Sequence, residues 1–454
     1  MSTFLHSDKR AQELNLKRFK IREKAKFCIC SICFISILYR LAALFWDSSL
    51  TSRSILMIKI SLPLCAMMIV IIILESCLFK KKGQNVVVAG FYDLGYGGDD
   101  EFIDNGVKVY RFRRKLASSF FQPAESVRVR GTYRILNATR ILQWDIKQSI
   151  KKYEVFLNTL IKKHQIDVVE MPDYNDYIRF CKEVVKFPKL PVPTIVKLHG
   201  SMTYINAERN ISTPPNVLQM EKWILDNADA VVSVSRYTAD KTAKYFNYQK
   251  EITVLYNGIN IPPLTTHPEN VDKVVVYSGS LLELKGVYQL MKAWNIVVKE
   301  IPDAKLYIFG KGPVHKLKAL LSMEGEKRVF FKGHVDRDKL FNVLASAEAA
   351  IFPSYTECFA LGPMEAMVNG AAVIYTLRAS GRELIQDGVN GMLIDPDDVE
   401  SIAERIIILL TNSELRDSLA AKGKQTIIDK FSIDKIVEDH IRFYENVINK
   451  AIYT

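Results

Sequence analysis

With 454 residues, the chain is too long for one ordinary hydrophobic core, and two domains with an appendage are the natural expectation. Hydrophobic residues make up 48% and charged residues 25% of the chain, a balance that excludes a disordered or low-complexity protein. Five of the seven cysteines lie in the first 80 residues, and Cys181 and Cys358 stand alone, a distribution that excludes a disulfide framework.

The net charge of +12 is concentrated near the N-terminus, where it flanks two apolar stretches. The first stretch, Phe27–Trp46, carries only the charge of Arg40, and the second, Ile60–Phe79, carries only that of Glu75. Each has the length of about 20 residues that a helix needs to cross a bilayer. Basic residues precede the first stretch and, as Lys80–Lys82, follow the second.

This charge distribution predicts an N-terminal transmembrane helical hairpin with both ends in the cytoplasm, because positive residues favour the cytoplasmic side. The alternative is one spanning helix and one interfacial helix, since Arg40 and Pro63 weaken the two segments. A cleaved signal peptide is not expected, because no small-residue cleavage site follows the first stretch. The sequence therefore predicts a membrane protein whose other domains lie on the cytoplasmic face.

From residue 84 onwards, short runs of Val, Ile and Phe alternate with helical stretches, the pattern of βαβ units. Two sets of such runs, separated by the proline-rich segment Gly258–Asp272, predict two doubly wound α/β domains that face a cleft. Ser432 can cap a C-terminal helix with one apolar face. The predicted division is a membrane region at 1–83, domains at 84–264 and 265–430, and a C-terminal helix at 431–454 that can pack back on the N-terminal domain.

Two glutamates, Glu357 and Glu365, mark a predicted strand, loop and helix in the second domain. The run "AAIFPS" predicts the strand, "YTECFALG" the loop and "PMEAMVNG" the helix, with Pro363 in its first turn. Unpaired amides at the start of this helix suit a phosphate, whereas carboxylates suit hydroxyl groups that donate hydrogen bonds. A ligand with phosphates and sugar hydroxyls satisfies both. Taken alone, the carboxylates would be explained by a solvated helix face.

The glutamates and their surroundings resemble the hallmark of one enzyme family. The residues "ECFALGPMEAM" are similar to the E-x7-E motif of the retaining nucleotide-sugar glycosyltransferases of the GT-B fold, family 4. The resemblance extends over roughly residues 84–430 through "LYNGINI", "SGSLLELKG", "YIFGKGP", "FFKGHV" and "GRELIQDGVNGMLIDPDD", in the order of the family. It implies two Rossmann-like domains, with the acceptor side in the first and the nucleotide-sugar donor side in the second.

The resemblance also implies roles for individual residues. Glu365 would hold the ribose hydroxyls of the nucleotide, and Glu357 would contact the transferred sugar. Lys285 matches the lysine that neutralises the leaving diphosphate, where a fixed ammonium stabilises the developing charge, and His199 matches the histidine near the reaction centre. The remaining matches are donor-binding positions and a glycine loop after the first strand of the domain: Phe359, Ala360, Leu361, Gly279, Ser280, Gly310 and Gly312, and Gly97 and Gly98. Taken one at a time, tight turns and a solvent-facing lysine are the alternative explanations.

The sequence departs from the family pattern at two of these positions. Ser280 stands where the family usually has a phosphate-binding arginine, for which Arg382 is a candidate substitute, and Ala360 replaces the usual glycine. These changes bear on the identity of the donor and on the rate of transfer more than on the fold. The chemistry implies no metal and no cofactor, and we interpret Asp395–Asp397, which imitates a metal-binding D-x-D, as a turn and helix cap.

A basic cluster in the first domain comprises Tyr110–Lys115 together with Arg128, Arg130 and Arg134. It could bind RNA, form a solvated face or contact anionic lipid headgroups. The adjoining apolar stretches favour the membrane, where each cation near the surface gains roughly 1 kcal/mol. We therefore expect a lipid-linked or glycan acceptor and no nucleic-acid partner.

Three functions remain after these observations. The first is a membrane-anchored retaining glycosyltransferase that moves a sugar from a nucleotide-diphosphate donor to that acceptor. The second is an inactive scaffold with a decayed donor site, for which Ser280 is the best support. The third is a nicotinamide-dependent oxidoreductase, which is disfavoured because the chain lacks G-x-G-x-x-G after the first strand of either domain. A P-loop hydrolase is disfavoured as well, because the chain lacks the phosphate-binding motif of that class.

Overall fold

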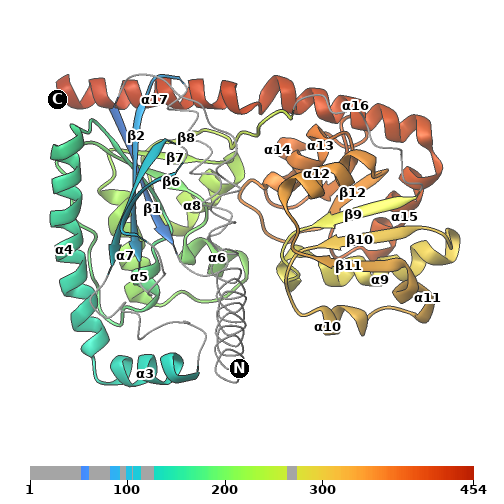
Figure 1. Cartoon of the computed structure of the whole chain (residues 1–454), viewed down its shortest axis with the longest axis horizontal. Coiled ribbons are helices and arrows are strands. Elements are labelled where there is room, and N and C mark those ends of the chain that lie inside the picture. The colour runs from blue at the N-terminus through green and yellow to red at the C-terminus, as the bar shows by residue number, and fades with distance from the viewer. Residues whose placement is uncertain are drawn as a thin grey trace, which may run out of the picture.

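The computed structural model describes residues 53–60, 82–92, 99–104, 106–113, 127–262 and 273–453. They form two α/β lobes, and the C-terminal helices run along the same side of both (Figure 1). We call residues 53–262 the N-terminal lobe and residues 273–430 the C-terminal lobe. Each lobe contains a largely parallel sheet, so the predicted α/β class is confirmed.

The sheet of the N-terminal lobe has eight strands in the order β3-β4-β2-β1-β5-β6-β7-β8. Neighbouring strands are parallel except β3 and β4, which are antiparallel. The strands are β1 (Arg53–Ile60), β2 (Asn85–Tyr92), β3 (Glu101–Asp104), β4 (Val107–Arg113), β5 (Val169–Pro172), β6 (Thr194–Leu198), β7 (Ala230–Ser233) and β8 (Ile252–Val254). The helices are α3 (Val127–Ala138), α4 (Ile141–His164), α5 (Asp176–Arg179), α6 (Met202–Glu208), α7 (Pro215–Asp226) and α8 (Arg236–Phe246).

Strand β1 corrects the prediction of a membrane hairpin. It lies between β2 and β5 in the middle of the sheet, although it overlaps the predicted connector between the two apolar stretches. The hairpin would place this connector on the opposite side of the membrane from the N-terminal lobe, but a segment that pairs with strands of the lobe must lie on the same side as the lobe. The stretch Phe27–Trp46 lies outside the described residues, as does all of Ile60–Phe79 but its first residue. Within the described part of the chain, every helix is too short or too polar to span a bilayer.

The sheet of the C-terminal lobe has six parallel strands in the order β11-β10-β9-β12-β13-β14. The chain reverses its direction of travel across this sheet between β9 and β12, and ligands of doubly wound proteins bind at such a switch point. The strands are β9 (Val274–Ser278), β10 (Lys305–Phe309), β11 (Val329–Gly333), β12 (Ala349–Phe352), β13 (Ala372–Thr376) and β14 (Met392–Ile394). The helical segments are the 3₁₀ turn η2 (Glu283–Lys285), α9 (Val287–Glu300), α10 (Val314–Lys318), α11 (Met323–Arg328), α12 (Arg337–Ser346), α13 (Leu361–Val368), α14 (Gly381–Leu384), α15 (Val399–Thr411) and α16 (Ser413–Lys430).

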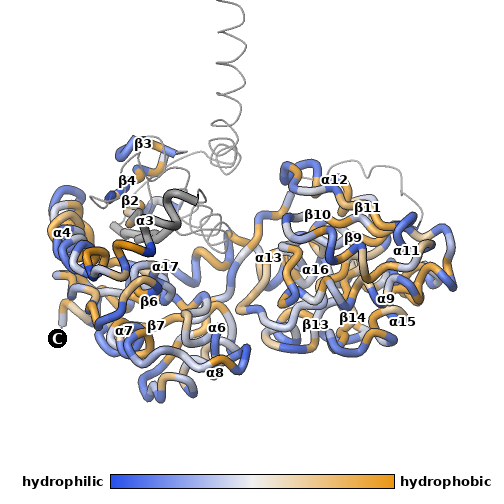
Figure 2. The backbone as a smooth tube through the Cα atoms, turned by 90° about the horizontal axis from the view of Figure 1, so that it is seen from below, coloured by the Kyte–Doolittle hydropathy of each residue, from blue (hydrophilic) through white to orange (hydrophobic). Residues whose placement is uncertain are grey.

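Both sheets are covered on both faces, as the nearly continuous apolar strands predict. In β9, Val275 and Tyr277 pack into one core and Val274 and Val276 into the other. Strand β2 divides its side chains between two cores in the same way. Hydrophobic segments accordingly follow the strands inside both lobes (Figure 2).

Helix α17 (Ile433–Tyr453) leaves the C-terminal lobe and packs on the N-terminal lobe. Its apolar side chains Ile433, Val437 and Tyr444 share a core with strands β2, β6 and β7. The buried Lys197 of β6 donates a hydrogen bond of 3.1 Å to Nε2 of His440 on this helix. The C-terminus therefore ties the two lobes together.

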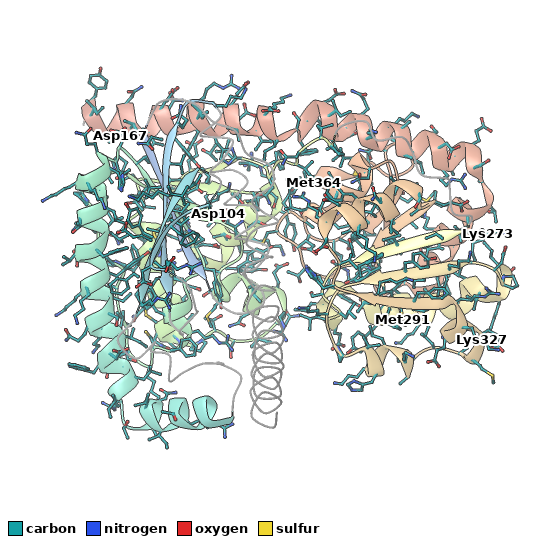
Figure 3. All side chains as sticks on the ribbon, in the orientation of Figure 1. Asp104, Asp167, Lys273, Met291, Lys327 and Met364 are labelled. Carbon is teal, nitrogen blue, oxygen red and sulfur yellow. The ribbon has the colours of Figure 1, made fainter. Side chains whose placement is uncertain are left out.

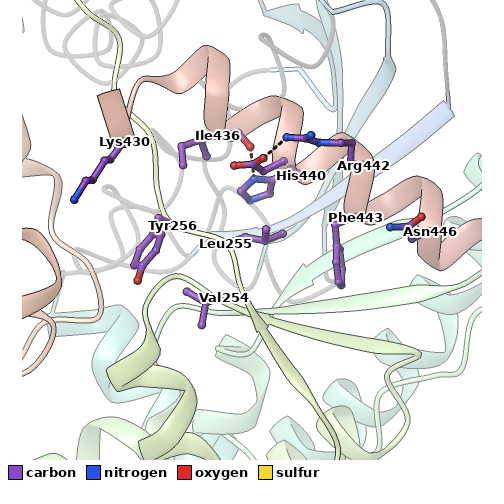
Figure 4. Close-up of a pocket in the computed structure, with 10 residues that line it drawn as sticks. Val254, Leu255, Tyr256, Lys430, Ile436, His440, Arg442, Phe443 and Asn446 are labelled. Atoms are coloured by element: carbon purple, nitrogen blue, oxygen red, sulfur yellow. Dashed lines mark hydrogen bonds and ion pairs between the residues drawn. The ribbon is translucent and has the colours of Figure 1, made fainter. Parts of the chain in front are cut away.

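A pocket of about 380 Å³ lies between α17 and the chain that follows β8 (Figure 4). Its lining includes Tyr256, Lys430, His440 and Arg442. None of the site residues predicted from the sequence lines it. It lies beside the junction of the lobes.

Candidate functional site

Lys285 and Glu357 form an ion pair at the switch point of the C-terminal lobe. Their Nζ and Oε1 atoms are 2.6 Å apart, with 25% of the lysine and 12% of the glutamate side chain exposed. Lys285 ends the turn after β9, and Glu357 lies in the loop after β12, so the adjacency of these strands brings the two residues together. Both residues were predicted from the sequence for one site, and the structure brings them together.

Gly286 allows the turn to approach the exit of β12. It has a φ of +68°, and a Cβ atom built there would lie 1.8 Å from the carbonyl oxygen of Pro353. The amide of Tyr355 also donates a hydrogen bond of 2.9 Å to the carbonyl oxygen of Leu284. A side chain at position 286 would push Lys285 away from Glu357, because a left-handed backbone and the close contact both require glycine.

The loop Glu357–Leu361, which we call the acidic loop, leads directly into α13. Ala360 precedes the helix in an extended conformation, and no side chain caps the helix. The first amides of a helix lack partners within the helix, so those at the start of α13 can bind an anion. Phe359 is buried against Tyr256 and Phe431, with ring centroids 5.0 and 5.4 Å away, which fixes the loop.

Glu365 lies one turn into α13 and pairs with Arg337 at 2.8 Å. Burial raises the pKa of Glu365, and the arginine counteracts this rise. Arg337 packs over Phe341, and its Nε atom is buried without a hydrogen-bond partner in the described part of the chain. Arg337 was not predicted from the sequence, although its place just after β11, at the carboxyl edge of the sheet, was a usable signal.

The glycine-rich turns after β9 and β10 press against each other. A Cβ atom at Gly310 would lie 1.7 Å from the carbonyl oxygen of Gly279, and one at Gly312 would lie 2.5 Å from Cβ of Leu281. These glycines therefore have a packing reason that is independent of any ligand. Ser280 is exposed in the same turn, and Arg382 is exposed in α14.

His199 begins a loop that two buried carboxylates hold in place. Asp173 accepts hydrogen bonds from the amides of His199 (2.9 Å) and Gly200 (3.2 Å), and Glu221 accepts them from Met202 (2.8 Å) and Thr203 (2.9 Å). Burial raises the pKa of Asp173 to about 7, against the lowering effect of these amides. Asp173 was not predicted from the sequence, although an acidic residue directly after a predicted strand could have indicated it.

The His199 loop meets the acidic loop across the two lobes. The thiol of Cys358 donates a hydrogen bond of 3.1 Å to the carbonyl oxygen of His199. Cys358 is the neighbour of Glu357, so the structure brings the predicted residues of the two lobes together here. The glycine loop with Gly97 and Gly98 lies outside the described residues.

The D-x-D-like segment has a structural explanation. Arg378 contacts both Asp395 and Asp397 at 2.6 Å, and Asp398 caps α15 by accepting the amide of Ser401 at 2.9 Å. The turn was predicted correctly, but the cap belongs to the next residue. In the parts of the chain that the structure describes, no group of three acidic, histidine or cysteine side chains has the arrangement of a metal site.

Comparison with known proteins identifies the family. The model of the glycosyl transferases group 1 matches residues 266–426, and that of Glycosyltransferase Family 4 matches residues 100–261. This chain belongs to the family 4 glycosyltransferases of the GT-B fold. The two matches correspond to the two lobes, with the ion pairs of Lys285 and Arg337 in the first model and His199 in the second.

Individual glycosyltransferases show how distant the relationship is. The chain is 24% identical to N-acetyl-alpha-D-glucosaminyl L-malate synthase of Bacillus anthracis, over 57% of this chain and 68% of that protein. It is 23% identical to poly(ribitol-phosphate) alpha-N-acetylglucosaminyltransferase of Staphylococcus aureus, over 60% of this chain but only 56% of that protein.

Solved glycosyltransferase structures share the fold. Sucrose-phosphate synthase from Thermosynechococcus elongatus superposes with a TM-score of 0.67 at 16% identity, over 88% of this chain and 100% of that chain. HepE of Anabaena in complex with UDP-glucose gives a TM-score of 0.62 at 16% identity, over 87% of this chain and 100% of that chain. These likenesses concern the fold alone.

Proposed function

We propose that this glycosyltransferase moves a sugar, with retention of configuration, from a nucleoside-diphosphate sugar to a lipid-linked or glycan acceptor at the cytoplasmic face of a membrane. The observation that carries the proposal is the Lys285–Glu357 pair at the switch point, beside the uncapped start of α13. It joins a cation, a carboxylate and helix amides within one loop region. These are the groups that a departing diphosphate and a sugar require.

The reaction breaks the bond between the anomeric carbon and the phosphate oxygen, and the electron pair leaves with the diphosphate. Lys285 and the first amides of α13 stabilise this negative charge where it develops. The acceptor hydroxyl attacks from the face that the diphosphate leaves, and its proton passes to a phosphate oxygen. Glu357 orients the sugar through its hydroxyl groups, and the loop of His199 closes the acceptor side.

Glu365 and Arg337 form the part of the site assigned to the nucleotide. The carboxylate accepts hydrogen bonds from the two ribose hydroxyls, and Arg337 holds it in position from the other side. The buried Nε atom of Arg337 is available for one more acceptor. A uridine nucleotide is the first candidate, because the related Anabaena structure holds UDP-glucose.

Relatives and charge support the proposed class of acceptor. The S. aureus relative acts on poly(ribitol-phosphate), and the B. anthracis relative on L-malate, both of which are anionic. A lipid-linked or polymeric glycan carrying phosphate would suit a chain with a net charge of +12. The positive charge of Lys285 replaces a metal ion at the diphosphate, so we expect transfer to continue in the presence of EDTA.

Membrane attachment is supported by the apolar stretch Phe27–Trp46 and by the outer face of α4. Ile141, Trp144 and Val155 are exposed by 48%, 64% and 66%, and they follow one another at helical spacing. Exposed lysines Lys151 and Lys152 lie among them. A tryptophan surrounded by lysines on a helix is the composition of a helix that rests on an anionic bilayer.

A ligand screen on the purified full chain in detergent tests the proposal. UDP-glucose, UDP-N-acetylglucosamine and GDP-mannose are added separately, and protection against thermal unfolding is measured. One of the nucleotide sugars should protect the protein, and Glu365→Ala should abolish most of the protection. The inactive-scaffold alternative predicts that the protein transfers and hydrolyses none of them, and that result would overturn the proposal.

A further inference from the structure

A carboxylate of the C-terminal lobe caps a helix of the N-terminal lobe. Glu383 of α14 accepts hydrogen bonds from the amides of Arg236 (2.7 Å) and Tyr237 (2.8 Å), the first two residues of α8. The hydroxyl of Tyr256 donates a third hydrogen bond, of 3.0 Å, to the same carboxylate. Three hydrogen bonds thus link one side chain to the opposite lobe.

The start of α8 is complete only when the lobes are docked. Within the N-terminal lobe, Ser235 accepts hydrogen bonds from two of the first four amides of α8. Its side chain accepts the amide of Thr238 (3.1 Å), and its carbonyl oxygen accepts the amide of Ala239 (3.1 Å). Glu383 serves the other two. The positive end of the helix dipole favours a carboxylate at this place. Separation of the lobes would return two amides and a carboxylate to water.

The same junction holds the acidic loop by its backbone. Asn257 donates a hydrogen bond of 3.1 Å to the carbonyl oxygen of Phe359, and Thr238 donates one of 3.4 Å to that of Cys358. Tyr256 joins the two sets of contacts, because its hydroxyl binds Glu383 and its ring packs against Phe359. Burial raises the pKa of Tyr256 to about 12, so its hydroxyl remains a donor at neutral pH. The N-terminal lobe therefore shapes the loop that carries Glu357.

We propose that Glu383 is a positioning residue that docks the lobes and thereby sets the acidic loop for sugar transfer. Its carboxylate acts through α8, Tyr256 and the loop rather than through the substrate. Lobe docking and loop order are one event in this arrangement, because the same residues make both sets of contacts. The kinetic consequences rest on the proposed function, whereas the consequences for loop order do not.

The test compares Glu383→Gln with Asp398→Asn in the full chain. The first substitution keeps the size of the side chain but replaces one acceptor oxygen with a donor group, so both amides cannot be served. The second makes the same chemical change at the start of α15, within a single lobe. Tyr256→Phe is a milder second variant that removes only the hydroxyl bound to Glu383, should the first fail to fold.

Hydrogen–deuterium exchange gives the readout that is independent of activity. In Glu383→Gln, exchange should rise about tenfold both at residues 236–237 and in the acidic loop, because local opening exposes amides. Asp398→Asn should raise exchange only at the start of α15. Tyr256→Phe should shift the acidic loop in the same direction by less. If the acidic loop of Glu383→Gln exchanged at the wild-type rate, the proposal would be overturned. If that variant does not fold, the same result in Tyr256→Phe would overturn it.

Kinetics with UDP-glucose and UDP-N-acetylglucosamine separate positioning from donor binding. In Glu383→Gln we expect kcat to fall about tenfold or more with little change in the KM of the donor, because misplaced groups slow the chemical step. Asp398→Asn should lower the melting temperature but leave kcat within about twofold of wild type. A kcat of Glu383→Gln as high as that of Asp398→Asn would overturn the proposal. If the wild-type chain turned over neither donor, the proposed function would fail, while the exchange measurement would still decide this inference.

Discussion

The two lobes use buried charge in different ways at the edges of their sheets. In the C-terminal lobe, side chains pair with side chains, as in Lys285–Glu357 and Arg337–Glu365. In the N-terminal lobe, Asp173 binds backbone amides of the His199 loop instead. A side-chain pair can exchange a partner for a ligand, because a change of rotamer leaves the backbone in place. A carboxylate bound to the backbone cannot do so without disturbing its loop.

The largest expected effect comes from removing the cation of the C-terminal lobe. Lys285→Ala should lower kcat about 10²–10³-fold with the acceptor saturating, since it removes a donor that acts on developing charge. Lys273→Ala is the matched control, because it breaks an ion pair of 2.7 Å with Asp303 at the outer edge of the same lobe, away from Met364 on α13 (Figure 3). Equal turnover of the two variants would contradict the assignment of Lys285.

The second effect concerns binding rather than turnover. Glu365→Ala should weaken binding of the nucleotide sugar about tenfold or more, since it removes charge-assisted hydrogen bonds and leaves the half-buried Arg337 without its carboxylate partner. Titration calorimetry with UDP and with the UDP-sugar measures the change. Glu326→Ala, which breaks an exposed pair with Lys318 at 2.9 Å, serves as the control and should bind like wild type. If UDP bound equally to both variants, Glu365 would not contact the nucleotide.

The N-terminal lobe should respond to pH through Asp173. Its pKa is about 7 in the folded protein and 3.8 as the unperturbed value, so between these pH values the folded state retains a proton that the unfolded state has lost. Its contribution to the free energy of unfolding therefore decreases as pH rises from about 4 to about 7. Asp173→Asn should be destabilised relative to wild type, and this difference should be larger at pH 5 than at pH 8.

Chemical denaturation at the two pH values checks this expectation. Asp303→Asn is a control of opposite sign, because Lys273 lowers the pKa of Asp303 by hydrogen bonding. The contribution of Asp303 is present at neutral pH and is lost only as pH falls below 3.8, so it should not differ between pH 5 and pH 8. A pH-independent difference between Asp173→Asn and wild type would contradict the described environment of Asp173.

The smallest effect is expected on the outer face of α4. Trp144→Ser should reduce binding of the full chain to anionic vesicles about threefold, since other attachments remain, and should change binding to neutral vesicles less. Met323→Ser removes a side chain that is 72% exposed in the C-terminal lobe and should have no effect. Vesicle flotation at increasing salt gives the measurement. Equal binding of both variants would remove α4 from the proposed membrane contact.

Prediction from the sequence succeeded where the information is local. The alternation of apolar runs identified β2 and the strands β5 to β13, and Pro363 indicated the start of α13, whereas β3, β4 and β14 were not among the predicted strands. It failed at β1, because a segment beside an apolar stretch has the same composition whether it enters a bilayer or the middle of a sheet. It also missed Arg337, Asp173 and Glu383, whose partners lie at least 28, 26 and 127 residues away in the chain.

The sequence by itself determined the α/β class, the two lobes and the chemical groups of the candidate site, because strand patterns and the spacing of Glu357 and Glu365 are read within short segments. Only the tertiary structure decided which charges pair. The parallel order of β9 and β12 brings Lys285 to Glu357, and the docking of the lobes brings Glu383 to α8. Such contacts depend on strand order and lobe packing, which result from many weak interactions distributed over the whole chain.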